Sequence, residues 1–291
     1  MPTWVDCSES VEEALARLDA ESKANAAARM AKKAADAAAA AAPKQRPLSG
    51  NALIDAMKSE DLAKCRSLYP ERGGDPYKPS WWNIMFGGEG REGLDKIKCE
   101  RNVWQIAKKS HLVRILLDAL KASGCEVDIR RHISCEVCDH SVTGGYDPIL
   151  NQVVVCQNTA RYQGLIQGVL THELIHMFDY CRNKMDLTDA KHLACTEIRA
   201  ANLAHCSFLS AWTYGSASPF NIKQRHQECV KQRATDSVLA VRDMPKEEAR
   251  EIVESVFDKC YGDLEPIGRR IRRGSDDIRK AYKERVYYGY I

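Results

Sequence analysis

The sequence predicts an α+β fold, in which several helices pack around a short sheet. Apolar residues recur at helical spacing from residue 103 to 122 and again in the later part of the chain. Short β-branched runs bounded by turn-forming residues predict strands near the middle of the chain. The chain has 291 residues, 44% of them hydrophobic and 29% charged, which is ordinary globular composition and excludes a collagen-like or wholly disordered protein.

Two strands are predicted, with helices before and after them along the chain. A helix over Val103–Ala122 ends before Gly124, a residue typical of a helix C-terminus. Strands come next, at Val127–Cys135 and Gln152–Cys156, with a glycine turn at Gly144–Gly145 between them. Further helices are predicted over Thr159–Cys181, Asp189–Phe208, Lys223–Arg242 and Lys246–Tyr261, of which the last two form a C-terminal helical hairpin jointed at Pro245.

Two N-terminal segments are predicted to lie outside the folded domain. Residues 1–50 are an alanine-rich extension, helical or disordered, whose methyl groups offer too little apolar area to hold a core. Residues 51–98 are predicted to be a linker with clusters of turn-forming residues. Residues 99–291 are then expected to hold the folded domain and its C-terminal hairpin.

Charge and hydropathy argue against several classes of function. The net charge is +3, and the basic run Arg269–Arg273 is followed at once by Asp276 and Asp277, so no nucleic-acid partner is predicted. No apolar run approaches the roughly 18–20 residues that cross a bilayer. The N-terminus is acidic and lacks the pattern of a secretory signal or a matrix presequence. We expect a soluble chain that would need another signal to enter an organelle.

One motif carries chemistry: residues 172–176 read His-Glu-Leu-Ile-His. His172 and His176 are four residues apart and face the same side of a helix, where both can bind one Zn²⁺ at about 2.0–2.1 Å. Glu173 is expected to act as general base on a metal-bound water. The flanking residues are strongly apolar, so the helix is predicted to be buried, where these polar groups need a partner such as a metal. The motif predicts a metal-dependent peptidase.

The third metal ligand has three candidates, because a catalytic zinc takes three protein ligands. Glu197 is preferred, since it lies 21 residues after His176 in the next predicted helix, which can fold back beside the first. Asp179 shares the face of both histidines, but a straight helix rarely surrounds one ion, and its alternative role is a hydrogen bond to a ligating histidine. His192 either binds the metal or flanks its helix.

The fold expected around the metal is a small zincin-like core with an active-site helix and a glutamate helix. The strand Gln152–Cys156 is expected to be the edge strand that aligns the substrate. Arg182 and Arg199 are predicted to form structural ion pairs. The choice of a group that stabilises an oxyanion stays open between Tyr180, Tyr214 and His226.

Ten of the 12 cysteines lie between Cys99 and Cys260, which favours a disulfide framework and an oxidising compartment. The competing interpretation is a structural zinc site at Cys135-x-x-Cys138, but the nearest other cysteines do not form a second close pair. Cys229 and Cys260 fall on the two C-terminal helices and are predicted to join that hairpin. The rest of the pairing stays open.

Beyond the motif, the segments Thr171–Arg182 and His192–Asn202 resemble the mitochondrial inner-membrane-associated zinc metalloprotease family that processes a subunit of the ATP synthase membrane sector. Other matching segments are Arg131–Cys138, Gly144–Tyr146, Val155–Asn158, Cys229–Thr235 and Ser237–Arg242. The resemblance covers about residue 99 to the C-terminus. It implies that His172, Glu173 and His176 are active-site residues and that Zn²⁺ is the cofactor.

The resemblance also implies a location and partners. The family is attached peripherally to the inner membrane on the intermembrane-space side and is retained there by oxidative folding. It removes the N-terminal extension of an ATP synthase membrane-sector subunit precursor and separately assists assembly of that sector with prohibitin-type partners. The expected function is therefore a zinc-dependent endopeptidase. The alternative is an assembly chaperone whose protease site is dispensable or idle.

Overall fold

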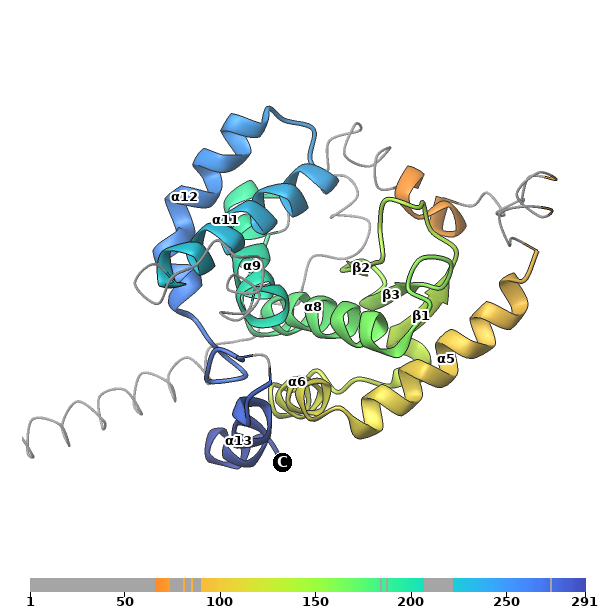
Figure 1. Ribbon diagram of the computed structural model, residues 1–291, viewed down its shortest axis with the longest axis horizontal. Helices are drawn as coiled ribbons and strands as arrows, with labels where there is room; N and C mark the ends of the chain where they lie inside the picture. The colour runs from red at the N-terminus through yellow and green to blue at the C-terminus, as the bar shows by residue number, and fades with distance from the viewer. Residues whose placement is uncertain are drawn as a thin grey trace, which may run out of the picture. The chain divides into compact units, whose positions relative to one another are not determined.

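A computed structural model describes residues 66–73, 81, 85, 90–183, 185–186, 188–206, 222–272 and 274–291. The expectations for the N-terminal extension, for much of the linker and for Tyr214 lie outside these residues. Within them the fold is α+β, as predicted, with a small sheet among many helices (Figure 1). None of the described helices is long and apolar enough to cross a membrane.

The described helices and strands span most of the chain from residue 70 onward. In chain order they are η1 Pro70–Gly73, α5 Glu92–Lys109, α6 His111–Ala122, α7 Ile129–His132, β1 Ile133–Glu136, β2 Gly144–Asp147, β3 Gln152–Cys156, α8 Gln163–Arg182, α9 Ala190–Ala200, the π-helical η2 Ala201–His205, α11 Ile222–Val241, α12 Lys246–Gly262, α13 Asp277–Glu284 and η3 Arg285–Tyr288.

The predicted helix 103–122 is two helices, because Ser110 interrupts it. Ser110 is extended, at φ −76° and ψ 115°, and it ends α5 and caps α6 by accepting a hydrogen bond from the Val113 amide. The predicted strand Val127–Cys135 is likewise divided: Asp128 caps the short helix α7, and β1 starts only at Ile133. Both differences arise from short polar side chains that bond the backbone locally.

The sheet has the strand order β1-β3-β2, with β1 parallel and β2 antiparallel to β3. The prediction that Gln152–Cys156 is an edge strand is wrong, because it is the central strand. The predicted turn Gly144–Gly145 is also wrong: both residues belong to the edge strand β2. A Cβ on Gly144 would overlap Val169 of α8 and lie 2.7 Å from the Val154 carbonyl oxygen. Gly144 therefore allows the strand to approach the helix closely, whereas Gly145 makes room for the Tyr69 ring.

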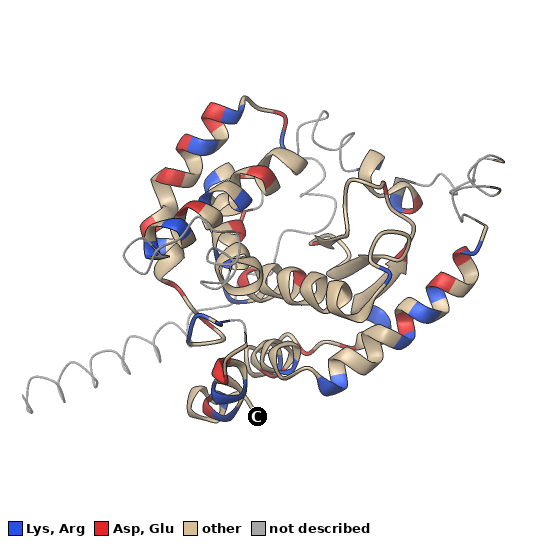
Figure 2. Ribbon diagram, viewed as in Figure 1, with Lys and Arg blue, Asp and Glu red and all other residues tan. Residues whose placement is uncertain are grey.

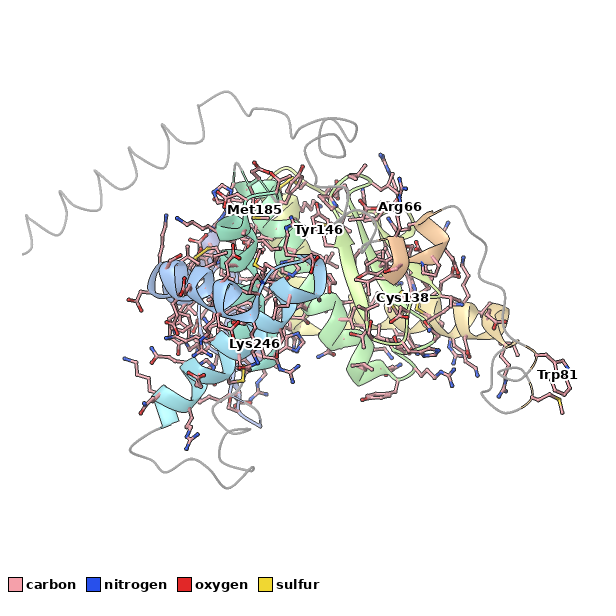
Figure 3. The ribbon with its side chains drawn as sticks, turned by 90° about the horizontal axis from the view of Figure 1, so that it is seen from above. Arg66, Trp81, Cys138, Tyr146, Met185 and Lys246 are labelled. Atoms are coloured by element: carbon pink, nitrogen blue, oxygen red, sulfur yellow. A yellow bond between two sulfur atoms is a disulfide. The ribbon has the colours of Figure 1, made fainter. Side chains whose placement is uncertain are left out.

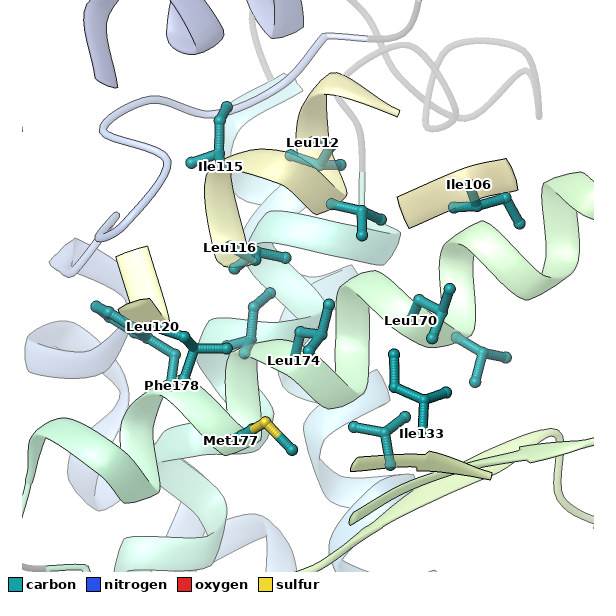
Figure 4. Packing of buried hydrophobic residues seen from close by; sticks show 14 of the residues in the cluster. Ile106, Leu112, Ile115, Leu116, Leu120, Ile133, Leu170, Leu174, Met177 and Phe178 are labelled. Carbon is teal, nitrogen blue, oxygen red and sulfur yellow. The ribbon is translucent and has the colours of Figure 1, made fainter. Parts of the chain in front are cut away.

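Helix α8 lies at the centre of the main core. It contacts α6 on one side and the sheet on another, and Figure 4 shows the resulting packing around Leu116, Leu120, Leu174 and Phe178, all fully buried. Because α8 is enclosed on several sides, its apolar residues are not confined to one stripe. The histidine motif is therefore held in a rigid, buried helix.

A second apolar cluster joins α9 to the C-terminal hairpin of α11 and α12. Ala194 and Ile198 of α9 pack against Val230 of α11 and Val253 of α12, and all four are fully buried. The boundaries of the hairpin agree with prediction within a residue, and α12 begins directly after Pro245. The hairpin thus supports α9 from the side away from the sheet.

The segment that includes η1 packs on the sheet. Tyr69 donates a hydrogen bond of 2.8 Å to the Gly144 carbonyl, and Arg72 pairs with Glu136 of β1 at 2.8 Å and with Asp147 of β2. Figure 3 shows this segment, which starts at Arg66, beside Cys138. One arginine therefore ties together the two outer strands of the sheet.

The ten cysteines from Cys99 to Cys260 form five disulfides, as the disulfide prediction requires. The pairs are Cys99–Cys135, Cys125–Cys181, Cys138–Cys156, Cys195–Cys260 and Cys206–Cys229. A structural zinc site at Cys135 and Cys138 is excluded, because each is bonded to another cysteine. The predicted Cys229–Cys260 link is wrong. Helix α9 packs against both hairpin helices, so each of these cysteines is bonded to the α9–η2 segment instead of to the other.

Candidate metal centre

Helix α8 places the three motif residues on one buried surface. The Nε2 atoms of His172 and His176 lie 3.0 Å apart, so both imidazoles point to the same position. The side chain of His172 is 13% exposed and that of His176 9%, and Glu173 is buried beside them. The spacing of the motif therefore produces the convergence that the sequence predicts.

Glu197 reaches the same position from α9. Its Oε2 lies 3.4 Å from Nε2 of His172, and its Oε1 lies 3.4 Å from Nε2 of His176. Glu197 is buried, and its Oε2 accepts no hydrogen bond from the part of the chain that the structure describes. A buried carboxylate oxygen without a donor, facing two imidazole nitrogens, fits a bound cation.

Burial and the neighbouring charges shift the pKa values of this cluster in opposite directions. Burial lowers the pKa of His176 to about 4 and raises that of Glu173 to about 7. Burial alone would raise the pKa of Glu197, but the two imidazoles outweigh it and lower the value to about 2. Burial would lower the pKa of His172, but Glu173 and Glu197 raise it to about 9. Glu197 is thus held as a carboxylate, available to a cation.

Asp179, the competing ligand, is linked to His176 through a hydroxyl group. Thr196 Oγ1 lies 2.9 Å from His176 Nδ1 and donates a hydrogen bond of 2.8 Å to Asp179 Oδ2. With Nε2 of His176 facing the cation position, its Nδ1–H donates to Thr196. Asp179 therefore supports a histidine, as its alternative role supposes, but indirectly and through a residue that sequence reasoning missed.

Arg199 also forms an ion pair with the Asp179 carboxylate. Its Nε donates to both carboxylate oxygens at 3.0 and 2.9 Å, and its other nitrogens reach the Asp263 and Glu265 carbonyls. Burial alone would lower the pKa of Arg199, but Asp179 more than offsets this and raises it. Arg182 pairs with Asp263 at 3.2 Å and with Glu265 at the surface. Both arginines form the structural ion pairs that the sequence predicts.

Replacing Arg199 is expected to destabilise the protein strongly. Arg199→Met leaves the Asp179 carboxylate buried without its cation, and we expect a loss of about 3–5 kcal/mol in the free energy of unfolding, measured in urea. Arg182→Met is the matched control, because Arg182 shares the partners Asp263 and Glu265 but is partly exposed; its loss should stay below about 1 kcal/mol. Equal losses for the two variants would contradict this account.

The remaining candidates contact other residues. His192 is exposed and accepts a hydrogen bond of 3.1 Å from the Asp186 amide, the helix-flanking role that was its alternative. His226 is buried between the Tyr261 hydroxyl and the Cys206 carbonyl, each 2.9 Å away, and so belongs to the hairpin interface. The ring of Tyr180 packs edge-on against that of Tyr146.

His205 contacts the site but was not predicted from the sequence. Its Nε2 lies 2.9 Å from Nδ1 of His172, on the ring edge opposite the cation position. His205 is the last residue of η2, in which Cys206 N bonds to the Ala201 carbonyl at 2.8 Å, five residues back. A regular α-helix would turn His205 to another direction, and no simple sequence pattern marks a π-helical turn.

Two histidines, a neighbouring glutamate and a second carboxylate from an adjacent packed helix are the arrangement of a metal-dependent peptidase. The chain belongs to the peptidase M76 family, a family of metallopeptidases, whose sequence profile matches residues 97–268. The match spans α5 to the segment after α12 and therefore includes every residue of the site described above.

Similar curated proteins carry names that agree with this family. The mitochondrial inner membrane protease ATP23 homologue of Danio rerio is 42% identical over 227 residues, which cover 77% of this chain and 84% of the relative. The Homo sapiens homologue is 46% identical over 174 residues, 59% of this chain and 70% of the relative. The Schizosaccharomyces pombe protease is 36% identical over 175 residues, 60% of this chain and 92% of the relative. No solved structure matches the chain.

Proposed function

We propose that this protein is a zinc-dependent endopeptidase with a zincin-like core. His172, His176 and Glu197 would hold Zn²⁺, and Glu173 would be the general base. The observation that carries the proposal is the buried Glu197 carboxylate, which lies 3.4 Å from both imidazole Nε2 atoms and has one oxygen without a hydrogen-bond donor among the described residues.

The residues around the cation position have separable tasks. A zinc ion held by His172, His176 and Glu197 would supply a Lewis acid for the attacking water and the peptide carbonyl. Glu173, adjacent to a ligand in the chain, takes the proton of the attacking water at its carboxylate and passes it to the leaving amine. Thr196 and Asp179 orient His176, and His205 accepts the Nδ1–H of His172, so that each Nε2 lone pair stays directed at the metal.

The proposed location and substrate rest on the relatives and the resemblance. Curated relatives are named mitochondrial inner membrane proteases. Five disulfides suit the intermembrane-space side of that membrane, an oxidising compartment. We propose peripheral attachment there, removal of the N-terminal extension of an ATP synthase membrane-sector subunit precursor, and assistance to assembly with prohibitin-type partners.

The test of the proposed function is cleavage of that precursor by the purified, oxidised chain. We expect a single new N-terminus, identified by mass spectrometry, that disappears on removal of metal by a chelator and returns with Zn²⁺. A precursor left intact by the zinc-loaded chain would overturn the proposed substrate. Cleavage that persists at full rate without metal would overturn the proposed chemistry.

Glu197→Gln is expected to weaken zinc binding more than Asp179→Asn. The first change removes a ligand charge, and we expect more than a 100-fold loss of affinity, whereas the second disturbs only a supporting contact and should cost about 10–100-fold. Competition against a chromophoric zinc chelator measures both, and His192→Gln is the control that should change nothing. If Asp179→Asn proves the more damaging, the assignment of the third ligand is wrong.

A further inference from the structure

Helix α5 has an inner face in the core and an outer face in solvent. Cys99, Val103 and Ile106 are buried against the rest of the protein. Charged residues are spread along α5, as Figure 2 shows. The exposed cations are Lys96, Lys98, Arg101, Lys108 and Lys109 of α5 and Arg91 just before it, and the one exposed acid of α5 is Glu100, while Glu92 and Asp95 are half-buried.

The same outer face exposes large apolar side chains. Leu94 is 55% exposed, Ile97 64% and Trp104 44%. Their positions fall three and seven residues apart, so they follow one line along the helix. Lys108 lies over the Trp104 ring, with its Nζ 4.3 Å from the ring centroid. The helix therefore presents an apolar line bordered by cations.

A cavity of about 210 Å³ lies on the flank of α5, between that helix and the segment that leads from β3 into α8. Three cations and one acid line it: Arg91 just before α5, Lys98 and Asp95 from α5, and Arg161 from the other wall. Gln157 also lines it, is 4% exposed, and has an Oε1 that accepts no hydrogen bond from any described residue. The cavity thus offers three cations against one carboxylate, an excess of positive charge.

We propose that the outer face of α5 and this cavity form a docking surface for an anionic phospholipid membrane. Leu94, Ile97 and Trp104 enter the boundary between headgroups and acyl chains, where Trp is favoured. Lys98 and Arg161 bind the phosphate of one headgroup at the cavity. This inference depends on the membrane association proposed above and assigns the surface of the protein that contacts the membrane.

The chemistry of this face favours a membrane over a protein partner. Six exposed cations against one exposed and two half-buried acids give this face an excess of positive charge that complements a negative surface, and lysines that flank apolar side chains reach headgroup phosphates while their stems cover apolar area. Trp81 and Met85, just before the helix, add exposed apolar side chains, 61% and 59% exposed. Failure to bind anionic vesicles would instead point to a protein partner for this face.

The test is flotation of the oxidised full chain with vesicles of phosphatidylcholine, with or without about 30% phosphatidylglycerol. We expect binding to the anionic vesicles that falls with added salt. Lys98→Ala with Arg161→Ala, and separately Ile97→Ser with Trp104→Ser, should each reduce the partition coefficient by about tenfold or more. All four side chains lie at the surface, so folding should be retained.

Matched controls make the result specific. Lys246→Ala with Lys259→Ala removes the same charge from α12, and Tyr287→Ser removes an exposed ring near the C-terminus; both should bind like the parent chain. Equal losses for controls and α5 variants, or no binding to anionic vesicles, would overturn the proposal. Binding of Glu173→Gln, which lacks the general base, should be unchanged. Cleavage of a short soluble peptide by the α5 variants should also be unchanged, so failure of the peptidase proposal and of the docking proposal can be told apart.

Discussion

Glu173→Gln is expected to lower peptidase turnover by about 10²–10⁴-fold while zinc stays bound. The amide keeps the size of the side chain but can no longer accept the proton of the attacking water. His172, His176 and Glu197 are untouched, so the metal content should equal that of the parent chain. Turnover on the precursor subunit and metal analysis of the same preparation are the two measurements.

The same variant separates the two functions considered for the chain. If precursor processing is lost but assembly of the membrane sector is restored in cells that lack the protein, the peptidase and assembly roles are independent. Loss of both would make assembly depend on cleavage. Normal turnover in Glu173→Gln would refute the proposed mechanism, and loss of zinc together with activity would leave Glu173 as a structural residue.

Reduction of the disulfides is expected to unfold the protein. Each disulfide typically contributes about 2–4 kcal/mol, so five contribute about 10–20 kcal/mol, as much as or more than the roughly 5–15 kcal/mol by which a domain is stable. Circular dichroism should show a cooperative transition that disappears or moves to much lower temperature with a reductant. Alkylation of the native protein without reductant should find no reactive thiols at the ten paired positions.

The loops that the disulfides close predict their relative importance. Replacing Cys195 and Cys260 by serine, 65 residues apart, should cost more stability than replacing Cys138 and Cys156, 18 residues apart. If both pairs are found as free thiols in protein isolated from its own compartment, the disulfide framework and the proposed compartment are both wrong.

The part of the site that lies on one helix could be predicted from the sequence. Residues four apart share a face of any α-helix, so the convergence of His172 and His176 requires no knowledge of tertiary structure. The prediction of Glu197 needed one further inference: two helices joined by a short connection usually pack side by side and run in opposite directions. Its placement 3.4 Å from both histidines agrees with that reasoning.

The features that could not be predicted depend on contacts between segments that are distant in sequence or on local backbone exceptions. Thr196 gains its role only because α9 packs beside Asp179. The disulfide partners of Cys229 and Cys260 are determined by the position of α9 against both hairpin helices. Gly144 looks like a turn residue because the sequence shows its flexibility but not the side chain of Val169 that presses against it.

The π-helical turn Ala201–His205 has a consequence for how this chain can vary. A π-turn is an α-helix with one residue inserted. Deleting one residue there would let the turn return to regular α-helix and rotate the residues after it by about 100°. His205 would then leave His172, and Cys206 would move away from Cys229. Across related sequences, this stretch should therefore tolerate substitutions of similar size but not insertions or deletions, so its length is under stricter selection than its composition.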